Sequence, residues 1–422
     1  MLLLSYLLEY NRYMNFFGIA AVLGVAWLCS RKKAAINFNL VVRALIVHFG
    51  IAFFVLKLSY GQKILSFISQ MVGTLYQSAD AGSSFIFGEL ANPAGPWAFV
   101  FAFKVLPIII FFGAFMSVLF HLGIVQRCVG GMSKIMQPIL GTSGAETLCT
   151  IANSFLGQTE APLLVKNYLK TMTRSEFLLV MISGMATISG AILVVFAGMG
   201  VPINHLLASS VMSIPASILI SKMLLPETEK KKAKNAKVTF ESKTANIFDA
   251  IFVGTSDGLQ LALNVAAMLI SFLSLLALIN FIFQYGAGYI NSVLLLFNSS
   301  YQLPVVTVGS LFSFLFAPFG YLLGFTGYEA LQVGQLLGTK VAVNELIAYG
   351  KMVDMGLSER TMSIATYVLC GFSNFSCIGI QIGGIGALVP ERRQWLTELG
   401  LTAVLGGVLA NLLSAMVVGL LI

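Results

Sequence analysis

The chain has 422 residues, of which 58% are hydrophobic and only 10% are charged, and its mean hydropathy is +0.90. These values exclude a water-soluble globular domain. The net charge of +8 comes mostly from basic clusters beside apolar runs, which indicate the cytoplasmic side of a membrane better than a nucleic-acid surface. We therefore predict an all-α integral membrane protein that does not bind nucleic acid.

The first predicted elements are two spans at about 14–29 and 40–59, each long enough to cross the hydrocarbon core as a helix. The basic residues 31–33 between them mark the cytoplasmic side, so the amino terminus is predicted to lie outside. Residues 60–98 then form an external stretch that can hold an interfacial helix. A third span, at about 99–122, returns to the cytoplasmic side.

The next segment places a glutamate, Glu160 of "GQTEAP", in an apolar setting. This segment, at about 141–170, has basic residues on both sides and is too short to cross the membrane and return as two full helices. We predict a re-entrant hairpin with the motif at its tip, because non-helical backbone is tolerated at that depth when it packs in protein or lines a cavity. Two spans, at about 176–200 and 203–225, follow it.

The second half of the chain begins after a polar stretch, 226–258, which is predicted to be a cytoplasmic linker and helix entry. A span at about 259–283 goes outward. The motif "KVAVNE" then carries a second carboxylate, Glu345, in an apolar setting, and we predict a second hairpin at about 327–350. An apolar run at about 361–388, rich in Gly, Ser and Asn at its centre, returns inward.

A last helix, at about 397–422, ends outside and brings the prediction to about eight spans. Each hairpin is followed at a similar distance by a polar interruption of an apolar run, around Gly184 in the first half and Gly371 in the second. The first half, 99–225, enters from inside and the second, 259–422, from outside, which predicts an inverted repeat. Such paired interruptions indicate a transporter with its binding site at the membrane midplane.

The two carboxylates are the leading functional candidates, because an ionised carboxylate in the bilayer is costly and persists when it has a partner or faces a wet cavity. Glu160 stands beside Gln158 and Thr159, so amide, hydroxyl and carboxylate groups meet at a predicted helix break. This set suits a flat heterocycle with alternating donors and acceptors. The alternative is structural, with each glutamate neutralising a nearby lysine, such as Lys340 near Glu345.

The polar groups of the second half suit a different part of a ligand. Glu345, Asn344 and Asn374 can bind vicinal hydroxyls, because a carboxylate accepts two hydrogen bonds from a diol. Phe372 and Phe375 either flank a ring or serve simple packing.

A separate group of oxygens indicates a sodium site near two helix breaks. Asn153, Thr187 and the carbonyls around Leu156 and Ile188 offer amide, hydroxyl and main-chain oxygens, the mixture found in transporters with unwound helices. Asn153 could equally cap a hairpin helix. The five cysteines and three histidines show no CxxC pair and no ligand spacing, so neither a disulfide framework nor a zinc site is predicted.

Six motifs appear in the chain in this order: "GQTEAP", "KTMTRSEF", "GLQLALNVAAMLI", "KVAVNE", "LCGFSN" and "GGIGALVPERR". Together they closely resemble the concentrative nucleoside transporters over nearly the whole chain. The resemblance implies a homotrimer whose protomers divide about eight membrane helices and two opposed hairpins between a scaffold, which includes 1–98, and a mobile transport domain. It also implies elevator-type import of a nucleoside such as uridine with sodium as coupling ion, in the plasma (inner) membrane, without organic cofactor or catalytic residues.

The resemblance assigns roles to individual residues. The residues implied to bind the substrate are Gln158, Thr159, Glu160 and Ile192 at the nucleobase, and Glu345, Phe372, Asn374 and Cys377 at the ribose. The residues implied to bind sodium are Asn153, Leu156, Thr187 and Ile188. Two positions depart from the common pattern: Thr187 replaces a serine and keeps the hydroxyl, whereas Cys377 replaces a serine with a thiol, a weaker hydrogen-bonding group.

Three other functions stay open from the sequence. Proton-coupled members of the family tend to lack the asparagine, so Asn153 favours sodium over protons. A passive channel would share the same spans. A membrane-embedded hydrolase could use Glu160 and Glu345 as acid and base, although neither a nucleophile motif nor a metal-ligand set accompanies them.

Overall fold

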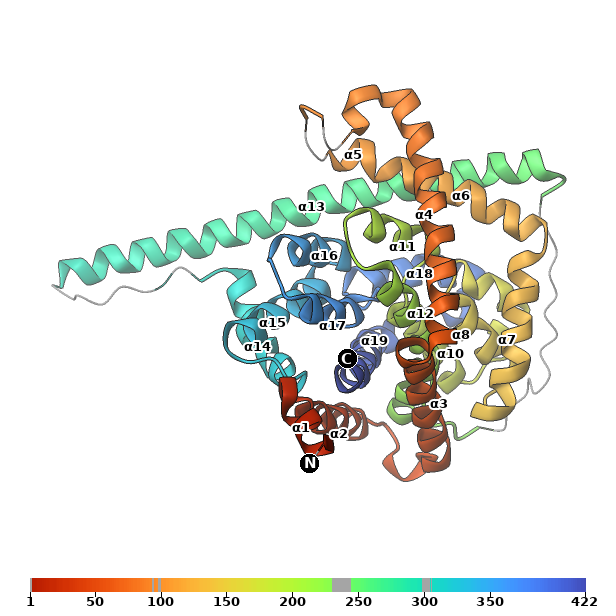
Figure 1. Cartoon of the computed structure of the whole chain (residues 1–422), viewed down its shortest axis with the longest axis horizontal. Helices are drawn as coiled ribbons and strands as arrows, with labels where there is room; N and C mark the ends of the chain where they lie inside the picture. The colour runs from red at the N-terminus through yellow and green to blue at the C-terminus, as the bar shows by residue number, and fades with distance from the viewer. Residues whose placement is uncertain (1, 93–94, 98–99, 230–243, 298–303, 305) are drawn as a thin grey trace.

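The computed structural model of the chain describes residues 2–92, 95–97, 100–229, 244–297, 304 and 306–422. All regular secondary structure in these residues is helical, with no strand among them, and the prediction of an all-α fold is confirmed (Figure 1). Residues 230–243 of the predicted linker, which include the lysines at 230, 231, 232 and 234, lie outside the described residues.

The helices follow one another along the whole described chain. Those of the first half are α1 (Leu2–Leu8), η1 (Glu9–Asn11), α2 (Tyr13–Leu28), η2 (Lys33–Ala35), α3 (Phe38–Lys57), α4 (Ser59–Phe87), η3 (Gly88–Ala91), α5 (Phe101–Lys104), α6 (Leu106–His121), α7 (Ile124–Leu140), α8 (Gly144–Asn153), η4 (Ala161–Val165), α9 (Lys166–Leu169), α10 (Arg174–Ala186), α11 (Gly190–Gly198) and α12 (Ile203–Leu224). Those of the second half are α13 (Ile247–Leu296), α14 (Val308–Leu322), α15 (Gly327–Ala342), α16 (Glu345–Asp354), α17 (Glu359–Leu369), α18 (Ser376–Leu388), η5 (Pro390–Arg392) and α19 (Arg393–Leu421).

In the described part of the chain, 6 helical segments are long and apolar enough to cross a membrane. Five of them coincide with predicted spans, namely those at 40–59, 99–122, 176–200, 203–225 and 397–422. The sixth, α13, contains the predicted span 259–283 but is much longer, with 50 residues.

Besides the longer α13, three predicted spans differ from the helices observed. The span 176–200 is divided into α10 and α11 at residues 187–189. The first span corresponds to α2, whose 16 residues rise about 24 Å and so fall short of the hydrocarbon thickness. The predicted span 361–388 is divided into α17 and α18 by a non-helical stretch at 370–375. In this stretch the backbone N–H groups of Phe372 and Phe375 donate to the carbonyls of Thr187 and Val341 in other segments, so they take no part in a helical ladder.

The centre of the molecule is α19, which is almost completely buried from Ala403 to Leu420. It packs against α10, α12, α17 and α18, and also against α2 and α3 of the amino-terminal part. By contrast, α13 runs along the outside, packs mainly on α6 and extends beyond the other helices (Figure 1). The body around α19 therefore forms one packed core, and α13 presents a long apolar face outward.

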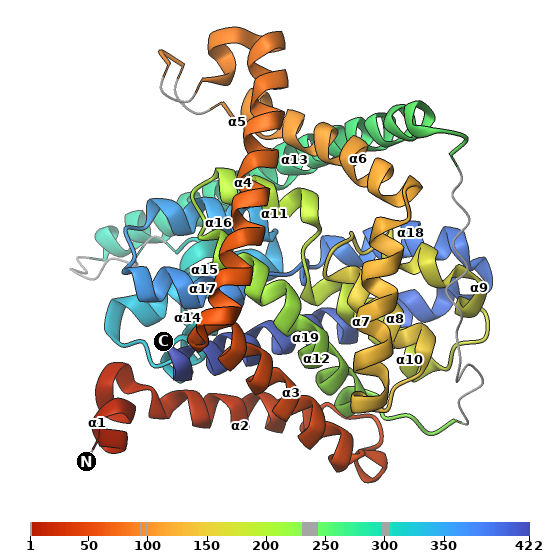
Figure 2. The same cartoon turned by 45° about the vertical axis from the view of Figure 1, so that its right-hand side comes forward.

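The two predicted hairpins are present as helix pairs. Hairpin 1 consists of α8, a non-helical tip at 154–160, and η4 with α9, and η4 folds back onto α8. Hairpin 2 consists of α15 and α16, which pack on each other. Figure 2 shows hairpin 1 on one side of α19 and hairpin 2 on the other. The two hairpins predicted from the glutamate motifs are thus observed, on different sides of the central helix in this view.

Buried polar contacts hold the base of hairpin 1. Ser143 and Glu146 form a capping box at the start of α8, in which each side chain bonds to the other residue's backbone. Glu146 is fully buried and pairs with the ammonium of Lys222 on α12 at 2.6 Å. Lys222 also donates to Ser175 of α10 at 3.1 Å, so three helices are joined at this point.

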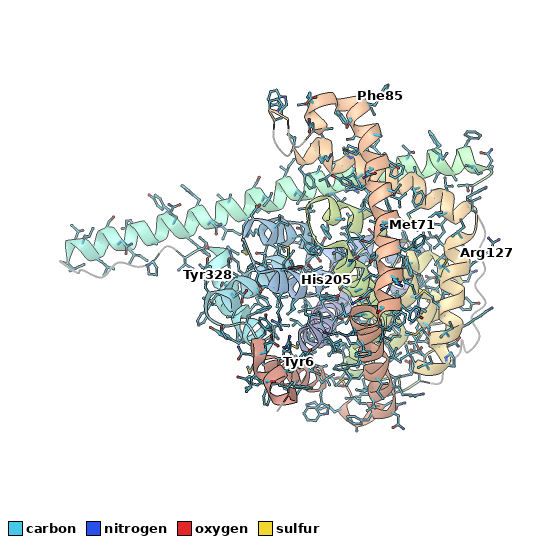
Figure 3. The ribbon with its side chains drawn as sticks, viewed as in Figure 1. Tyr6, Met71, Phe85, Arg127, His205 and Tyr328 are labelled. Carbon is cyan, nitrogen blue, oxygen red and sulfur yellow. The ribbon has the colours of Figure 1, made fainter. Side chains whose placement is uncertain are left out.

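Large apolar side chains are exposed around the periphery. Met71, Phe85 and Tyr328 are 54%, 91% and 74% exposed, and Phe85 and the charged Arg127 lie at the edge of the molecule in Figure 3. His205, labelled near the middle of the same view, is half-buried instead and forms a hydrogen bond of 3.1 Å with the hydroxyl of Tyr367. This distribution fits a surface covered by lipid or by other protomers, because soluble monomers rarely expose so much apolar area.

Candidate functional site

Two broken helices meet at the middle of the molecule. The first break separates α10 from α11 at Thr187–Ser189, and the second separates α17 from α18. The backbone N–H of Phe372 in the second break donates to the carbonyl oxygen of Thr187 in the first, at 3.2 Å. Gly371 permits this approach, since a Cβ atom there would lie 2.7 Å from the carbonyl oxygen of Met185. The paired interruptions read from the sequence therefore lie side by side.

A chain of hydrogen bonds joins the tips of the two hairpins. Asn374 donates from Nδ2 to Oε2 of Glu345 at 3.0 Å, and its Oδ1 accepts from the backbone N–H of Cys377 at 3.0 Å. The Cys377 sulfur then accepts from Nε2 of Gln158 at 3.2 Å. Gln381 completes the chain by donating to Oε1 of Gln158 at 3.1 Å. Two segments far apart in the sequence are thus brought into one polar cluster, whose members are at most 7% exposed.

The tip of hairpin 1 packs closely against the first broken helix. Gly184 of α10 lies under it, and a Cβ atom at this position would be 2.8 Å from Cβ of Gln158. Thr159 lies against Gly384 of α18. Glu160 is exposed instead and lines a cavity. Its carboxylate accepts a hydrogen bond from the N–H of Gly157 at 3.3 Å.

This cavity has a volume of about 500 Å³ and lies between hairpin 1 and helices α6, α7, α11 and α13. Thr159 and Glu160 line it, together with Asp257 of α13, a carboxylate that we did not single out from the sequence. Glu345 and Gln158 are absent from its lining. The structure therefore places Glu160 beside an open space and Glu345 inside the packed cluster. The other predicted substrate residues are placed apart from this cavity, with Ile192 buried at the start of α11 and Phe372 half-buried in the second break.

The predicted sodium residues gather where α8 ends beside the first break. Asn153 is fully buried, and its Nδ2 donates to the hydroxyl of Ser183 on α10 at 2.8 Å. The amide thus reaches across to another helix instead of capping α8. Its Oδ1 has no hydrogen-bond partner among the described residues. The Thr187 hydroxyl donates to the carbonyl of Ser183 at 2.9 Å, so its own lone pairs stay available.

Leu156 and Ile188 lie next to this group, both buried and both outside helices. The oxygens near Asn153 are neutral amide, hydroxyl and carbonyl groups. Within the described ranges, no cluster of His, Cys, Asp or Glu side chains could hold a metal ion. This donor set matches the hard, uncharged oxygens that sodium prefers and contains no ligand typical of a transition metal.

Sequence reasoning missed Gln381 and Asn411, which are single polar groups within apolar helices. Gln381 belongs to the hydrogen-bond chain and also donates to the carbonyl of Met181 at 2.9 Å. Lys340, which the sequence suggested as a partner of Glu345, instead donates to the carbonyl of Val368 and to Asn411, and Glu345 lies beyond ion-pair distance from it. The sequence signal that could have identified such residues is a single amide or ammonium side chain within an apolar run.

Three protein-family models match the chain in order. They are described as the Na+ dependent nucleoside transporter N-terminus, over residues 17–90, as nucleoside recognition, over 102–202, and as the Na+ dependent nucleoside transporter C-terminus, over 205–419. The chain belongs to the concentrative nucleoside transporter family. The resemblance seen in the sequence motifs is confirmed.

Characterised and uncharacterised relatives align with this transporter over nearly its whole length. An uncharacterized transporter of Haemophilus influenzae is 41% identical over 416 residues, covering 97% of both chains. The nucleoside permease NupC of Helicobacter pylori is 35% identical over 424 residues, covering 98% of both chains. Human solute carrier family 28 member 3 is 32% identical over 430 residues, which is 97% of this chain and 60% of the human protein.

Solved structures share the fold of this transporter. CNTnw in an inward-facing substrate-bound state is 35% identical, with a TM-score of 0.88 over 97% of this chain and 98% of that one. A variant of CNTnw in an outward-facing state is 34% identical, with a TM-score of 0.89 over 97% of each chain. These relatives and neighbours are transporters, so the protein is a multi-pass membrane transporter and the hydrolase alternative is set aside.

Proposed function

We propose that this transporter imports nucleosides by symport with sodium. The observation that carries the proposal is the hydrogen-bond chain from Glu345 to Gln158, which joins both hairpin tips into one polar cluster. Beside it lies a buried, unpartnered oxygen on Asn153, where a cation would complete the bonding. The names of the matched family models and of the relatives support nucleoside as substrate and sodium as coupling ion.

The substrate would bind between the two hairpin tips. Its nucleobase would contact Gln158, Thr159, Glu160 and Ile192, and its ribose Glu345, Phe372, Asn374 and Cys377. A carboxylate that already accepts one bond, as Glu345 does from Asn374, retains lone pairs for ribose hydroxyls. The Gln158 amide is satisfied by Cys377 and Gln381, so a nucleobase would bind there by replacing these bonds with its own.

Sodium would travel as a second cargo, held by Asn153 and Thr187 side chains and by the carbonyls of Leu156 and Ile188. The unpartnered Oδ1 of Asn153 fits such an ion, because leaving a buried acceptor unsatisfied costs about 1–3 kcal/mol. A transport domain carrying only one ligand would leave polar groups unsatisfied in a low-dielectric setting. This difference would couple nucleoside entry to the sodium gradient.

Alternating access would be of the elevator type, in the plasma (inner) membrane, with both termini outside. We propose that residues 1–98 contribute scaffold helices, that 99–225 and 259–422 are the inverted repeats, and that 226–258 forms a cytoplasmic linker and helix entry. The long exposed apolar face of α13 supports assembly into a homotrimer, where partner protomers would cover part of it.

Uptake of radiolabelled nucleosides into proteoliposomes tests the function. With an inward sodium gradient we expect intact uridine, or another member of a panel with cytidine, adenosine and deoxynucleosides, to accumulate above equilibrium. Replacing sodium with choline is expected to abolish accumulation. Accumulation driven by a proton gradient would show that protons are the coupling ion. Equilibration of the nucleoside without accumulation would indicate a channel.

The thiol of Cys377 provides a sharper test of the ribose site. In the Cys377→Ser variant, the hydroxyl is a stronger donor and acceptor than the thiol, and one better hydrogen bond is worth about 1 kcal/mol. We therefore expect nucleoside affinity to rise about 3- to 10-fold in equilibrium binding assays, with sodium affinity unchanged. Cys128→Ser, an exposed cysteine on α7, is the matched control. Equal effects on ribonucleosides and on analogues without ribose hydroxyls would contradict the assignment.

A further inference from the structure

Lys340 is completely buried in the last turn of α15, the first helix of hairpin 2. Its ammonium donates to the carbonyl oxygen of Val368 at 2.8 Å and to Oδ1 of Asn411 at 2.7 Å. The ion pairs found among the described residues do not include it, whereas the buried Lys222 pairs with Glu146. Both hydrogen bonds of this ammonium go to neutral oxygens, and Glu345 acts on it from beyond ion-pair distance. A buried charge held in this way is costly to keep in a membrane protein, which indicates a functional role.

Asn411 of α19 connects this ammonium to both helix breaks. Its Nδ2 donates to the carbonyls of Ala186 and Cys370, each at 2.8 Å. Ala186 is the last residue of α10 and Cys370 directly follows α17, so one amide satisfies a carbonyl at the end of each broken helix. Its Oδ1 accepts from Lys340 at 2.7 Å and from Ser373 at 3.3 Å. Every donor and acceptor site of this 1% exposed side chain is in use.

The two helix breaks that Asn411 connects contain residues of the proposed sodium and nucleoside sites. Thr187, a proposed sodium residue, directly follows Ala186, and its carbonyl accepts from the N–H of Phe372 on the ribose side. A displacement of either break would therefore be transmitted to the other through Asn411 and through this backbone bond. Gly371 fits between them, since a Cβ atom there would lie 2.6 Å from Oδ1 of Asn411.

The two halves of the molecule use the same contact in different ways. In each half, the end of the first hairpin helix meets the last turn of the helix before the break. In the first half, Asn153 reaches Ser183 and leaves an oxygen that lacks a donor. In the second half, Lys340 reaches Val368 and supplies a positive charge from the chain itself.

We propose that Lys340 is a tethered cation that takes, in the second half, the place sodium takes in the first, and that Lys340 and Asn411 are positioning residues that couple the sodium and nucleoside sites. The inference rests on the sodium-coupled function proposed above. Bound sodium orders the first break, Asn411 transmits this order to the second, and Lys340 holds Asn411 in the orientation that bonds to both carbonyls.

The test measures the coupling factor, which is the nucleoside dissociation constant in choline divided by that in saturating sodium. The full-length protein is reconstituted in nanodiscs and titrated with uridine, or with the best substrate from the uptake panel. We expect a factor of about 10 or more in the wild type, and at least a fivefold lower factor in Lys340→Met and in Asn411→Leu. Reciprocity requires nucleoside to lose its effect on sodium affinity to the same extent.

Ser414→Ala is the matched control. Ser414 is 1% exposed on α19, one turn from Asn411, and among the described residues its hydroxyl donates to the carbonyl of Ala410 in its own helix. The control variant is expected to keep the wild-type coupling factor. Thermal unfolding and size-exclusion profiles identify which variants are folded, and Asn411→Leu decides the question if Lys340→Met is not monodisperse.

The possible outcomes distinguish a failure of this inference from a failure of the proposed sodium-coupled transport. A wild-type factor of one would overturn sodium coupling, and the inference with it. A coupled wild type together with folded variants that keep the full factor would overturn the inference alone and reduce Lys340 to a structural role. Because the second half carries its own cation, we also expect one sodium ion per nucleoside from reversal of uptake at known gradients. A ratio of two would contradict the tethered cation.

Discussion

Replacing Glu345 by glutamine is expected to weaken nucleoside binding by about 10- to 100-fold while leaving sodium affinity within about twofold. The carboxylate would accept hydrogen bonds from ribose hydroxyls, and a bond to a charged group contributes about 1.5–3 kcal/mol, where 1.4 kcal/mol corresponds to a factor of ten. Glutamine keeps an oxygen for the bond that Asn374 donates, so the packing of the cluster is preserved. Equilibrium titration with nucleoside in saturating sodium measures the change.

A dideoxynucleoside supplies the decisive comparison for Glu345. If the carboxylate binds the diol, removing the hydroxyls weakens binding to the wild type strongly and to Glu345→Gln very little, which a double-mutant cycle quantifies. Glu89→Gln, at an exposed position on η3 remote from both hairpins, is the control and should behave as wild type. An undiminished penalty for the dideoxynucleoside in Glu345→Gln would remove the ribose assignment.

Replacing Asn153 by alanine is expected to lower sodium affinity by about 10- to 100-fold. At saturating sodium, the nucleoside affinity of the variant is expected to lie within about threefold of the wild-type value. The substitution removes the buried Oδ1 that lacks a donor, and an ion–dipole contact of this kind is comparable to a charged hydrogen bond of about 1.5–3 kcal/mol. The sodium concentration that gives half-maximal uptake in proteoliposomes measures the effect.

Ser183→Ala separates the ligand role of Asn153 from its packing role. That change removes the hydroxyl that receives a bond from Asn153 Nδ2 and leaves Oδ1 in place. We expect it to change sodium affinity less than threefold, whereas Asn153→Asp, which keeps a side-chain oxygen, should retain sodium-dependent uptake. Equal losses of sodium affinity in Asn153→Ala and Ser183→Ala would show that the amide only supports the helix contact.

Much of the fold could be predicted because membrane insertion depends on short-range properties of the sequence. Apolar length identified most of the spans, and charge and glycine within apolar runs marked both hairpins and both breaks. Glu160 and Glu345 were prominent because carboxylates are rare in such surroundings. Two helices differ in length from the predicted spans: α2 is short for a full crossing, and α13 continues well past the most apolar part of its sequence.

The partners of each polar side chain depended on the packing of distant helices. Gln158 and Gln381 bond to each other although 223 residues separate them, and no local pattern specifies that pairing. Proximity in the sequence suggested Glu345 as the partner of Lys340, yet Asn411, 71 residues further on, receives its hydrogen bond.

The sequence by itself therefore determined the class of protein, the position of the hairpins and the residues that carry charge into the membrane, since each follows from the transfer energy of short segments. Only the tertiary structure decided that Glu160 faces a cavity while Glu345 lies in a closed hydrogen-bonded cluster, and that one asparagine spans both breaks. Hydrogen bonds act over about 3 Å, so the angles and close approaches of packed helices select which of many possible polar partners meet.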